Sequence, residues 1–143
     1  MTEGVEVVQK LLSGKVVEHH GEVYDVSGVR FAPVEVPVWT SGIWPRKVPF
    51  LAAAHASGLF PIIQDGSGGF AVASAEQAAR MKADFVAAGG PADGDLAIWG
   101  GGARPSAAQV SEYADAGATW LLLDGWKASL DELRSYVSAG PPR

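Results

Sequence analysis

Cysteine is absent from this chain of 143 residues, which excludes disulfide bridges, thiolate metal sites and a cysteine nucleophile. The absence agrees with a reducing compartment. No apolar run approaches the roughly 20 residues that span a bilayer, and the segment Met1–Gly4 lacks the cationic start of a signal peptide. We therefore expect a cytoplasmic protein that does not enter a membrane.

Clusters of lysine and arginine are also lacking, and the formal net charge is −5. Proteins that bind nucleic acids neutralise phosphates with such clusters, so nucleic acid is not an expected partner. The sequence contains neither a P-loop nor a Ser-His-Asp order, which removes the usual signals for a kinase or a hydrolase. The 18 glycines and 9 prolines are the informative excess, because they separate periodic segments rather than form a low-complexity tract.

The first part of the chain changes its hydrophobic period. Val5, Val8 and Leu12 recur at helical spacing and predict an amphipathic helix over about the first 13 residues. The stretch from Val17 to Phe31 predicts a short β-hairpin, with Ser27-Gly28 as its turn and the glycine supplying a positive φ.

The three histidines do not form a recognisable metal site. His19 and His20 are adjacent on a predicted strand and therefore point to opposite faces, and no third ligand stands at a metal-binding spacing. We expect a pair on the hairpin surface and no bound metal. His55 lies on an apolar helical face and is predicted to be a hydrogen-bonded packing residue.

After Pro37 the chain becomes regular, with four short β-type runs that are each followed by a glycine-bearing loop and a helical pattern. These runs are Pro37–Thr40, Leu59–Ile63, Leu96–Trp99 and Thr119–Leu123. Strand-then-helix repetition requires parallel strands joined by right-handed crossovers.

Three of the four helices have a capping box at their start, in which a serine and a residue three positions later satisfy free backbone amides. The pairs are Ser74 with Gln77, Ser106 with Gln109, and Ser129 with Glu132. Each helix has a glycine close past its end. The predicted apolar faces are Ala78/Met81/Phe85, Val110/Tyr113/Ala114 and Leu130/Leu133/Val137. The remaining helix is predicted to start near Pro45, with Val48, Leu51, Ala52 and His55 on one face.

Four βα units fit either an open doubly wound sheet or half of an eight-stranded barrel, and periodicity does not choose between them. A nucleotide-binding open sheet normally shows G-x-G-x-x-G after its first strand, which Thr40–Pro45 does not match, and the preceding hairpin suits that fold badly. A complete barrel takes about 250 residues. We therefore expect an α/β fold in one domain over 1–143: a helix and short hairpin over 1–36, then a partial (β/α) barrel of about four parallel units over 37–143.

The order of several motifs resembles the later part of the luciferase-like flavin-dependent monooxygenases. Ser13-Gly14-Lys15, His20–Tyr24 and Phe31-Ala32-Pro33 are followed by Val36–Gly42, which is similar to that family's strand of the type P-I-W-V-G-G. Further along, Ala52–Ile62 is similar to A-x-x-A-D-G-W-x-P, and Tyr113–Asp124 resembles the penultimate helix and last strand. The resemblance covers essentially the whole chain.

This resemblance implies a (β/α) barrel that binds reduced FMN or a deazaflavin coenzyme and carries out monooxygenation or hydride transfer on a small organic substrate. In the family, the opening strands of the barrel supply most acid/base residues, and they have no counterpart here, so no catalytic residue is assigned. Two positions depart from the family's flavin site: Ser41-Gly42 replaces paired glycines, and Ser57 replaces an acidic residue.

Ligands of barrels meet the loops after the carboxyl ends of the strands, where glycine lets backbone amides approach a phosphate. On the resemblance, Ser41 and Gly42 with neighbouring Thr40 are the expected phosphate contacts, and Ile63 and Gln64 lie nearby. Arg104, after three glycines, offers a bidentate fork for a phosphate or carboxylate. The competing interpretations are turn glycines and a solvated arginine. The five tryptophans cluster at strand ends and are expected to pack, although an indole there can stack on a flavin.

Two hypotheses about function follow. In the first, the chain is a flavin-dependent oxidoreductase that self-associates as a pair of half-barrels, because an open parallel sheet leaves backbone groups and hydrophobic strand faces unpaired at Pro37–Thr40 and Thr119–Leu123. In the second, it is a truncated, non-catalytic relative that binds a phosphate-bearing ligand or a protein.

Overall fold

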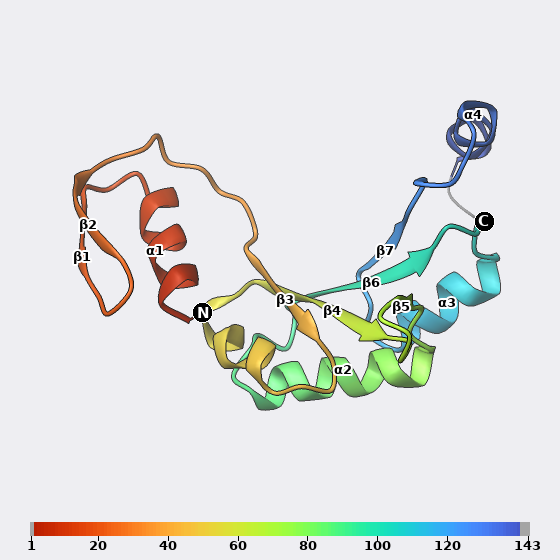
Figure 1. The fold of residues 1–143 in the computed structure, drawn as a ribbon, viewed down its shortest axis with the longest axis horizontal. Helices are drawn as coiled ribbons and strands as arrows, with labels where there is room; N and C mark the ends of the chain where they lie inside the picture. The colour runs from red at the N-terminus through yellow and green to blue at the C-terminus, as the bar shows by residue number, and fades with distance from the viewer. Residues whose placement is uncertain (1, 141–143) are drawn as a thin grey trace.

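The computed structural model describes residues 2–140, apart from the side chains of Val48, Pro49 and Leu51 (Figure 1). The elements are, in order, α1 (Thr2–Leu12), β1 (Val17–His20), β2 (Asp25–Val29), β3 (Trp39–Ile43), η1 (Val48–His55), β4 (Gly58–Gln64), β5 (Phe70–Ala71), α2 (Ala75–Ala87), β6 (Asp95–Gly101), α3 (Ala107–Asp115), β7 (Trp120–Leu123) and α4 (Leu130–Ala139). They form a curved molecule, with α1 and the β1–β2 hairpin at one end and α4 at the other (Figure 1).

The hairpin next to α1 exists as expected, but its turn lies elsewhere. Strands β1 and β2 pair antiparallel from His20 with Asp25, so the chain reverses over residues 21–24 rather than at Ser27-Gly28. Gly28 does have a positive φ of 68°, and it lies inside β2 near a break in the register. The predicted turn glycine is therefore a bulge residue, which distorts the strand without reversing it.

A polar cluster attaches the hairpin to α1. His19 is 9% exposed, and its Nε2 lies 3.0 Å from a carboxylate oxygen of Glu3, while Lys10 Nζ lies 3.2 Å from its Nδ1. Because an ammonium group only donates, Nδ1 accepts and Nε2 carries the hydrogen that Glu3 receives. The carboxylate of Glu3 also accepts from the amides of Val23 and Tyr24. His20 is exposed as expected, but His19 is buried, so the prediction of two surface histidines was wrong for His19.

The four strands β3, β4, β6 and β7 form one parallel sheet in that order, which confirms the predicted partial β/α barrel preceded by a helix and a hairpin. The first strand is displaced from its prediction, running from Trp39 to Ile43 rather than from Pro37 to Thr40. The short strand β5 was not expected, and it pairs antiparallel with the end of β4.

Helices cover one face of the sheet, and the main core lies between them and the strands (Figure 1). Leu59, Leu96 and Ile98 from the strands pack with Met81 and Phe85 of α2, and each of the five side chains is at most 1% exposed. The predicted apolar face of α2 is thus confirmed. Among residues 2–140, no helix lies over the opposite face of the sheet (Figure 1).

The three predicted capping boxes are all present, at Ser74, Ser106 and Ser129. The helix after β3 differs from its prediction, because it is a 3₁₀ helix that begins at Val48 rather than an α-helix that begins near Pro45. His55 at its end is exposed rather than packed, although its backbone carbonyl accepts a hydrogen bond from Gln9. The side chains of Val48 and Leu51, expected on the same face, lie outside the described ones.

Helix α4 has the predicted apolar stripe, but nothing in the described chain buries it. Leu130, Leu133 and Val137 are 63%, 39% and 82% exposed, and no residue of the helix is buried. The predicted apolar face of α4 is therefore present, and the described residues leave it uncovered. Two hydrogen bonds hold the carboxyl-terminal part of the helix, where the Tyr136 hydroxyl donates to the Gly102 carbonyl and Arg104 donates to the Gly140 carbonyl.

Replacement of Met81 by alanine should test the core under the sheet. The Met81 side chain is fully buried between α2 and the strands, so the Met81→Ala variant should lose about 2–5 kcal/mol of unfolding free energy in urea titrations. Val86→Ala, at a 40% exposed position of the same helix, is the matched control and should change stability by about 0.5 kcal/mol or less. Equal losses in the two variants would contradict this placement of α2.

The contact between Glu3 and His19 makes a pH-dependent contribution to stability. The His19 side-chain hydrogen bond, followed by the Tyr24 amide, lowers the pKa of Glu3 from its ordinary value. A lowered folded-state pKa stabilises the fold above the unfolded-state pKa, and this stabilisation is lost as pH falls through the folded value. Glu3→Gln should therefore lower the urea midpoint at pH 7, and the difference from wild type should shrink in acid.

The control for this pH effect is Glu22→Gln, whose carboxylate makes none of these contacts and should leave the midpoint unchanged at either pH. A Glu3→Gln difference that stays constant from neutral pH to below pH 4 would contradict the role given to the carboxylate.

Candidate functional site

The site begins where strands β4 and β6 separate. Each strand has seven residues, but they pair only at Gly58 with Asp95 and at Leu59 with Leu96. Beyond these pairs the strands diverge toward their carboxyl ends. The short strand β5 enters the resulting wedge and pairs with Ile63 and Gln64 at the end of β4. Between these pairings, the β4 backbone from Phe60 to Ile62 has no ladder partner on its β6 side.

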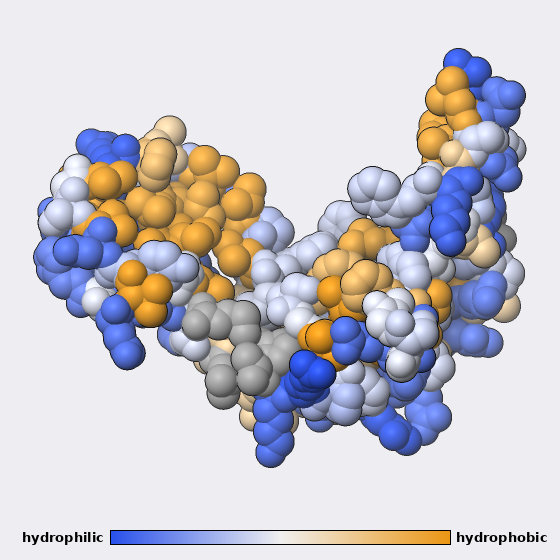
Figure 2. Space-filling view, in the orientation of Figure 1, coloured by the Kyte–Doolittle hydropathy of each residue, from blue (hydrophilic) through white to orange (hydrophobic). Residues whose placement is uncertain are grey.

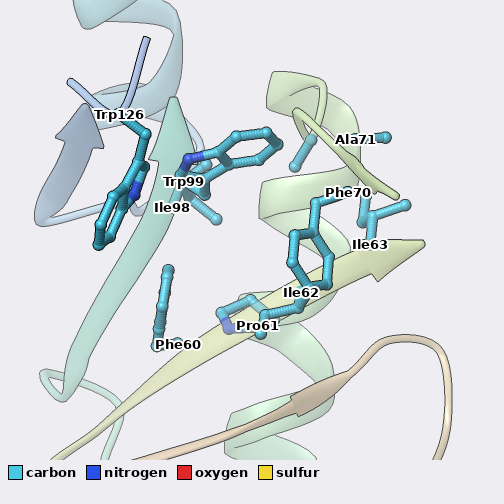
Figure 3. Close-up of a pocket in the computed structure, with 10 residues that line it drawn as sticks. Phe60, Pro61, Ile62, Ile63, Phe70, Ala71, Ile98, Trp99 and Trp126 are labelled. Carbon is cyan, nitrogen blue, oxygen red and sulfur yellow. The ribbon is translucent and has the colours of Figure 1, made fainter. Parts of the chain in front are cut away.

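An apolar pocket of about 240 Å³ occupies this wedge (Figure 3). Its lining comes from β4, β5, β6 and the loop after β7, and consists of Phe60, Pro61, Ile62, Ile63, Phe70, Ala71, Ala73, Ile98, Trp99 and Trp126. Figure 3 shows Phe60, Phe70, Trp99 and Trp126 around a common space. The pocket thus combines four aromatic rings with a stretch of β4 that pairs with β3 but lacks a strand partner on its β6 side.

The rings of the pocket are held to different degrees. Trp99 donates from Nε1 to an Asp124 carboxylate oxygen at 2.8 Å, and its ring lies edge-on to Phe70 with centroids 6.3 Å apart at 76°. This geometry is favourable for an aromatic pair. Trp126, by contrast, is 93% exposed. One wall of the pocket is therefore fixed, and the opposite wall is a ring free to meet a ligand.

Phe70 reaches the pocket because Asp65 organises the loop before β5. One carboxylate oxygen of Asp65 accepts from the Ser67 amide at 2.9 Å, the Ser67 hydroxyl at 2.7 Å and the Gly69 amide at 2.9 Å. These bonds, led by that of the Ser67 side chain, lower the pKa of Asp65. The carboxylate is thus committed to the turn that returns the chain toward β4.

The opposite end of the sheet is closed by a polar and aromatic layer. The strands β3, β4, β6 and β7 begin with Trp39, Gly58, Asp95 and Trp120 respectively. Both indoles donate to the Asp95 carboxylate, at 3.1 and 3.2 Å, and their centroids are 5.7 Å apart. A Cβ on Gly58 would lie 2.8 Å from Trp39 Cδ1 and 2.6 Å from Asp95 Cβ, so only glycine leaves room for this arrangement.

The three expected phosphate contacts on β3 lie inside the strand rather than in a loop after it. Thr40 pairs with Leu59 and is buried on the helix-covered side, and its hydroxyl has no hydrogen-bond partner. Ser41 pairs with Phe60, on the open side, and its hydroxyl donates to the Phe60 carbonyl at 2.8 Å. Gly42 follows with a half-buried backbone. The structure therefore separates Thr40 from Ser41 by the thickness of the sheet.

The other expected residues lie at two further strand ends. Ile63 lines the pocket, and the neighbouring Gln64 is exposed at the last position of β4. Arg104 follows β6 and donates from one guanidinium nitrogen to the Ala139 and Gly140 carbonyls at the end of α4. Of the six residues, Ile63 alone lines the pocket, Ser41 contacts a pocket residue, and Arg104 is engaged with α4.

The aromatic residues of the pocket are the main features that the sequence did not assign to a site. Trp99 and Trp126 were expected to pack, and four of the five indoles do donate to an aspartate. Phe60 and Phe70 were not singled out. An available signal was the alternation Leu59, Phe60, Pro61, Ile62, Ile63, which places Phe60 and Ile62 on the face opposite the core.

The comparison with protein families agrees with this arrangement. The family model described as luciferase-like monooxygenase matches residues 1–139. The chain belongs to that family. No curated protein and no solved structure matches it in the two other comparisons. Within residues 2–140, no helix of this family member has the length and hydropathy needed to cross a bilayer.

Gly58→Ala tests the closed end of the sheet in this luciferase-like chain. The added methyl group should displace the Trp39 indole or strain β4, with a loss of about 1–3 kcal/mol in urea unfolding and a shifted tryptophan emission. Gly102→Ala is the control, since its Cβ would meet only ordinary contacts at 3.5 Å. An unchanged emission spectrum and midpoint for Gly58→Ala would refute the close approach.

Proposed function

We propose that this chain is a flavin-dependent oxidoreductase of the monooxygenase type, which binds FMN or a deazaflavin coenzyme at the carboxyl ends of its strands. The observation that carries the proposal is the aromatic pocket between the diverging strands β4 and β6, in a chain of the luciferase-like monooxygenase family.

The shape and chemistry of the pocket fit the ring system of a flavin. Ligand pockets commonly measure about 300–1,000 Å³, so a space of about 240 Å³ suits a fused ring better than a whole nucleotide. A flavin ring is flat and apolar at one end, and it has an amide-like edge at the other. Trp126 and Phe70 offer faces or edges for the flat ring. The Phe60 and Ile62 carbonyls are engaged by Ser41 and Trp44, so the Pro61 carbonyl is the backbone acceptor that remains for the amide edge on the side that β6 leaves unpaired.

The phosphate of the coenzyme would lie outside the pocket, at the rim. The carboxyl end of β3 contains Ser41 and Gly42, and β4 ends at Gln64. Ile63, the residue before Gln64, lines the pocket, so this rim is continuous with it. Thr40 supports the strand from the helix side. Arg104 would supply charge from the loop after β6 through the guanidinium nitrogens that do not bond α4. These are the residues that we propose for cofactor binding.

When bound, a reduced flavin or deazaflavin supplies a hydride, and a reduced flavin can also react with oxygen. The residues of this chain orient the ring and exclude water from it, because the lining is apolar. No lining residue of the pocket has an ionisable side chain. The small organic substrate must therefore receive its acid/base groups from elsewhere, which fits a site completed by assembly of the chain into a homo-oligomer.

The lack of an ionisable group in the lining also favours a second candidate function. A chain that binds a flat, phosphate-bearing ligand without turnover needs an aromatic pocket and a rim of amides, and it needs no acid or base. The two functions differ in turnover and share the same binding site.

A flavin titration tests the proposed site. Wild-type protein should quench flavin fluorescence on binding FMN or a deazaflavin, and Trp126→Ala should weaken binding roughly threefold to tenfold through loss of a ring contact. The variant should keep its stability within about 0.5 kcal/mol, because Trp126 is almost fully exposed.

Trp126→Phe is the matched control, since it retains a ring and should retain most of the affinity. If neither FMN nor a deazaflavin binds the wild-type chain, the proposed function is lost. Binding without oxidation of reduced coenzyme over a panel of small organic substrates would select the non-catalytic function.

A further inference from the structure

We propose that two copies of this chain bind each other reciprocally, with α4 of each copy lying in the apolar groove between α1 and residues 31–36 of the other. This inference names the surfaces of the assembly and rests on the homo-oligomer in the proposed function. It rests on five features of the described chain: an uncovered helix face, a groove without an occupant, their separation, their charge pattern and their position around the pocket.

The helix face is a complete amphipathic stripe. Leu130, Leu133 and Val137 repeat at helical spacing, and all are exposed, with Val137 at 82%. Isolated helices of about ten residues are marginal in water, and most helical stability in proteins comes from packing an apolar face. Since Ser129 begins α4 with a complete capping box, its helical form is specified locally, while a partner for its face is not.

The groove is lined almost entirely by apolar atoms and has a volume of about 440 Å³. Its walls are Val8, Leu11 and Leu12 of α1 and Phe31, Ala32 and Val34 of the following segment. The Val34 amide bonds to the Leu12 carbonyl at 3.0 Å, which holds the two walls together. Val8, Phe31 and Val34 are 44%, 56% and 46% exposed, so the groove is formed but uncovered.

The two apolar surfaces cannot meet within one chain. Helix α4 and the groove lie at opposite ends of the curved molecule (Figure 1). Figure 2 shows hydrophobic residues gathered on the flank of the α1 lobe and on the side of α4, and both gatherings face the concavity between them. A second copy placed across this concavity presents its own α4 to the groove and its own groove to α4. Each contact is then formed twice under a two-fold axis.

The charges beside the two surfaces are complementary in one orientation. Asp131 and Glu132 lie at the start of α4, and Arg134 forms an ion pair with Asp131 at 3.2 Å, so this part of the helix carries a net negative charge. Beside the groove, the exposed Arg30 donates to the Gly14 carbonyl just after α1, and the exposed Lys15 is the next residue along the chain. Docking with the start of α4 near Lys15 and Arg30 therefore sets an acidic segment against two cations. The reverse orientation separates these opposite charges, which is less favourable.

Reciprocal docking has a consequence for the ligand pocket. The open face of the sheet lies between the two docking surfaces of each copy (Figure 1). Trp126 and Phe70 line the pocket on this face (Figure 3). The second copy would therefore cover this face, exclude water from the pocket and bring its own residues toward it.

Sedimentation velocity tests the two surfaces separately. The wild-type chain should be a dimer at micromolar concentration, and Val137→Glu or Val34→Glu should each raise the dimer dissociation constant about tenfold or more. Val23→Glu, at a position 72% exposed in the hairpin turn, is the control and should leave the dimer intact. A mixture of Val137→Glu and Val34→Glu chains retains one intact helix and groove pair, so it should dimerise more tightly than either variant alone.

Since the chain has no cysteine, introduced thiols give a second test. Two double variants, Val34→Cys/Val137→Cys and Val8→Cys/Val137→Cys, should be oxidised to covalent dimers, whereas Val23→Cys/Val137→Cys and each single variant should not. The opposite placement of the two surfaces excludes the same disulfide within one chain.

A wild-type chain that remains monomeric, or a dimer that is insensitive to both Val137→Glu and Val34→Glu, would overturn this inference. A monomeric wild type would mean that the two surfaces bind another protein. A dimer insensitive to both substitutions would mean that the copies associate through strand edges. Flavin titration of the same samples keeps the two proposals distinguishable: dimerisation without flavin binding removes the proposed function alone, and flavin binding by a monomer removes the assembly alone.

Discussion

The covering of the parallel sheet on one face alone is the constraint on which the rest of this structure depends. Parallel sheets are almost always buried on both faces, because the helices that connect their strands lie over those faces. Here α2 and its neighbours cover the face that presents Leu59 and Leu96, while Phe60 and Ile62 on the same strand point the other way. The helices do not cover this second face, and in the proposals above a ligand and a second chain are what remove it from water.

The two ends of this uncovered face differ in a way that suits a binding site. At the beginning of the strands, Trp39 and Trp120 converge on Asp95, and these hydrogen bonds tie the starts of β3 and β7 to the start of β6, while Gly58 of β4 pairs with Asp95 in the ladder. Toward the carboxyl ends, β4 and β6 separate and leave a pocket. A site needs a rigid base to hold its lining residues and an opening through which a ligand enters. The two indoles fix the strands at their beginnings, so the strands can separate at their carboxyl ends without loss of the sheet.

Local signals in the sequence predicted the elements well, because they depend on neighbours along the chain. Ser74, Ser106 and Ser129 begin helices as their capping boxes require, and the order of strand and helix gave the parallel sheet. Properties that depend on distant neighbours were missed. Burial of His19 follows from Glu3 and Lys10 on another element, and the pocket follows from strands that stop pairing after Leu59 and Leu96. Neither the burial of His19 nor the pocket can be predicted from periodicity along the chain. Gly28 is a similar case, because its positive φ was predicted but its position inside a strand was not.

The exposed stripe of α4 is another feature whose local structure is set by the sequence nearby while its packing depends on distant residues. A sequence that encodes a capping box, an apolar stripe and a glycine past the helix end specifies a helix that packs against something. The structure shows the capping box and the helix, but within the described residues the apolar stripe packs against no other element. Trp126, only four residues before Leu130, is even more exposed and lines the pocket. The segment from Trp126 to Val137 thus presents apolar surface first at the pocket and then along α4. In the proposed dimer the partner that binds α4 lies beside the pocket, so that model predicts coupling between ligand binding and dimerisation.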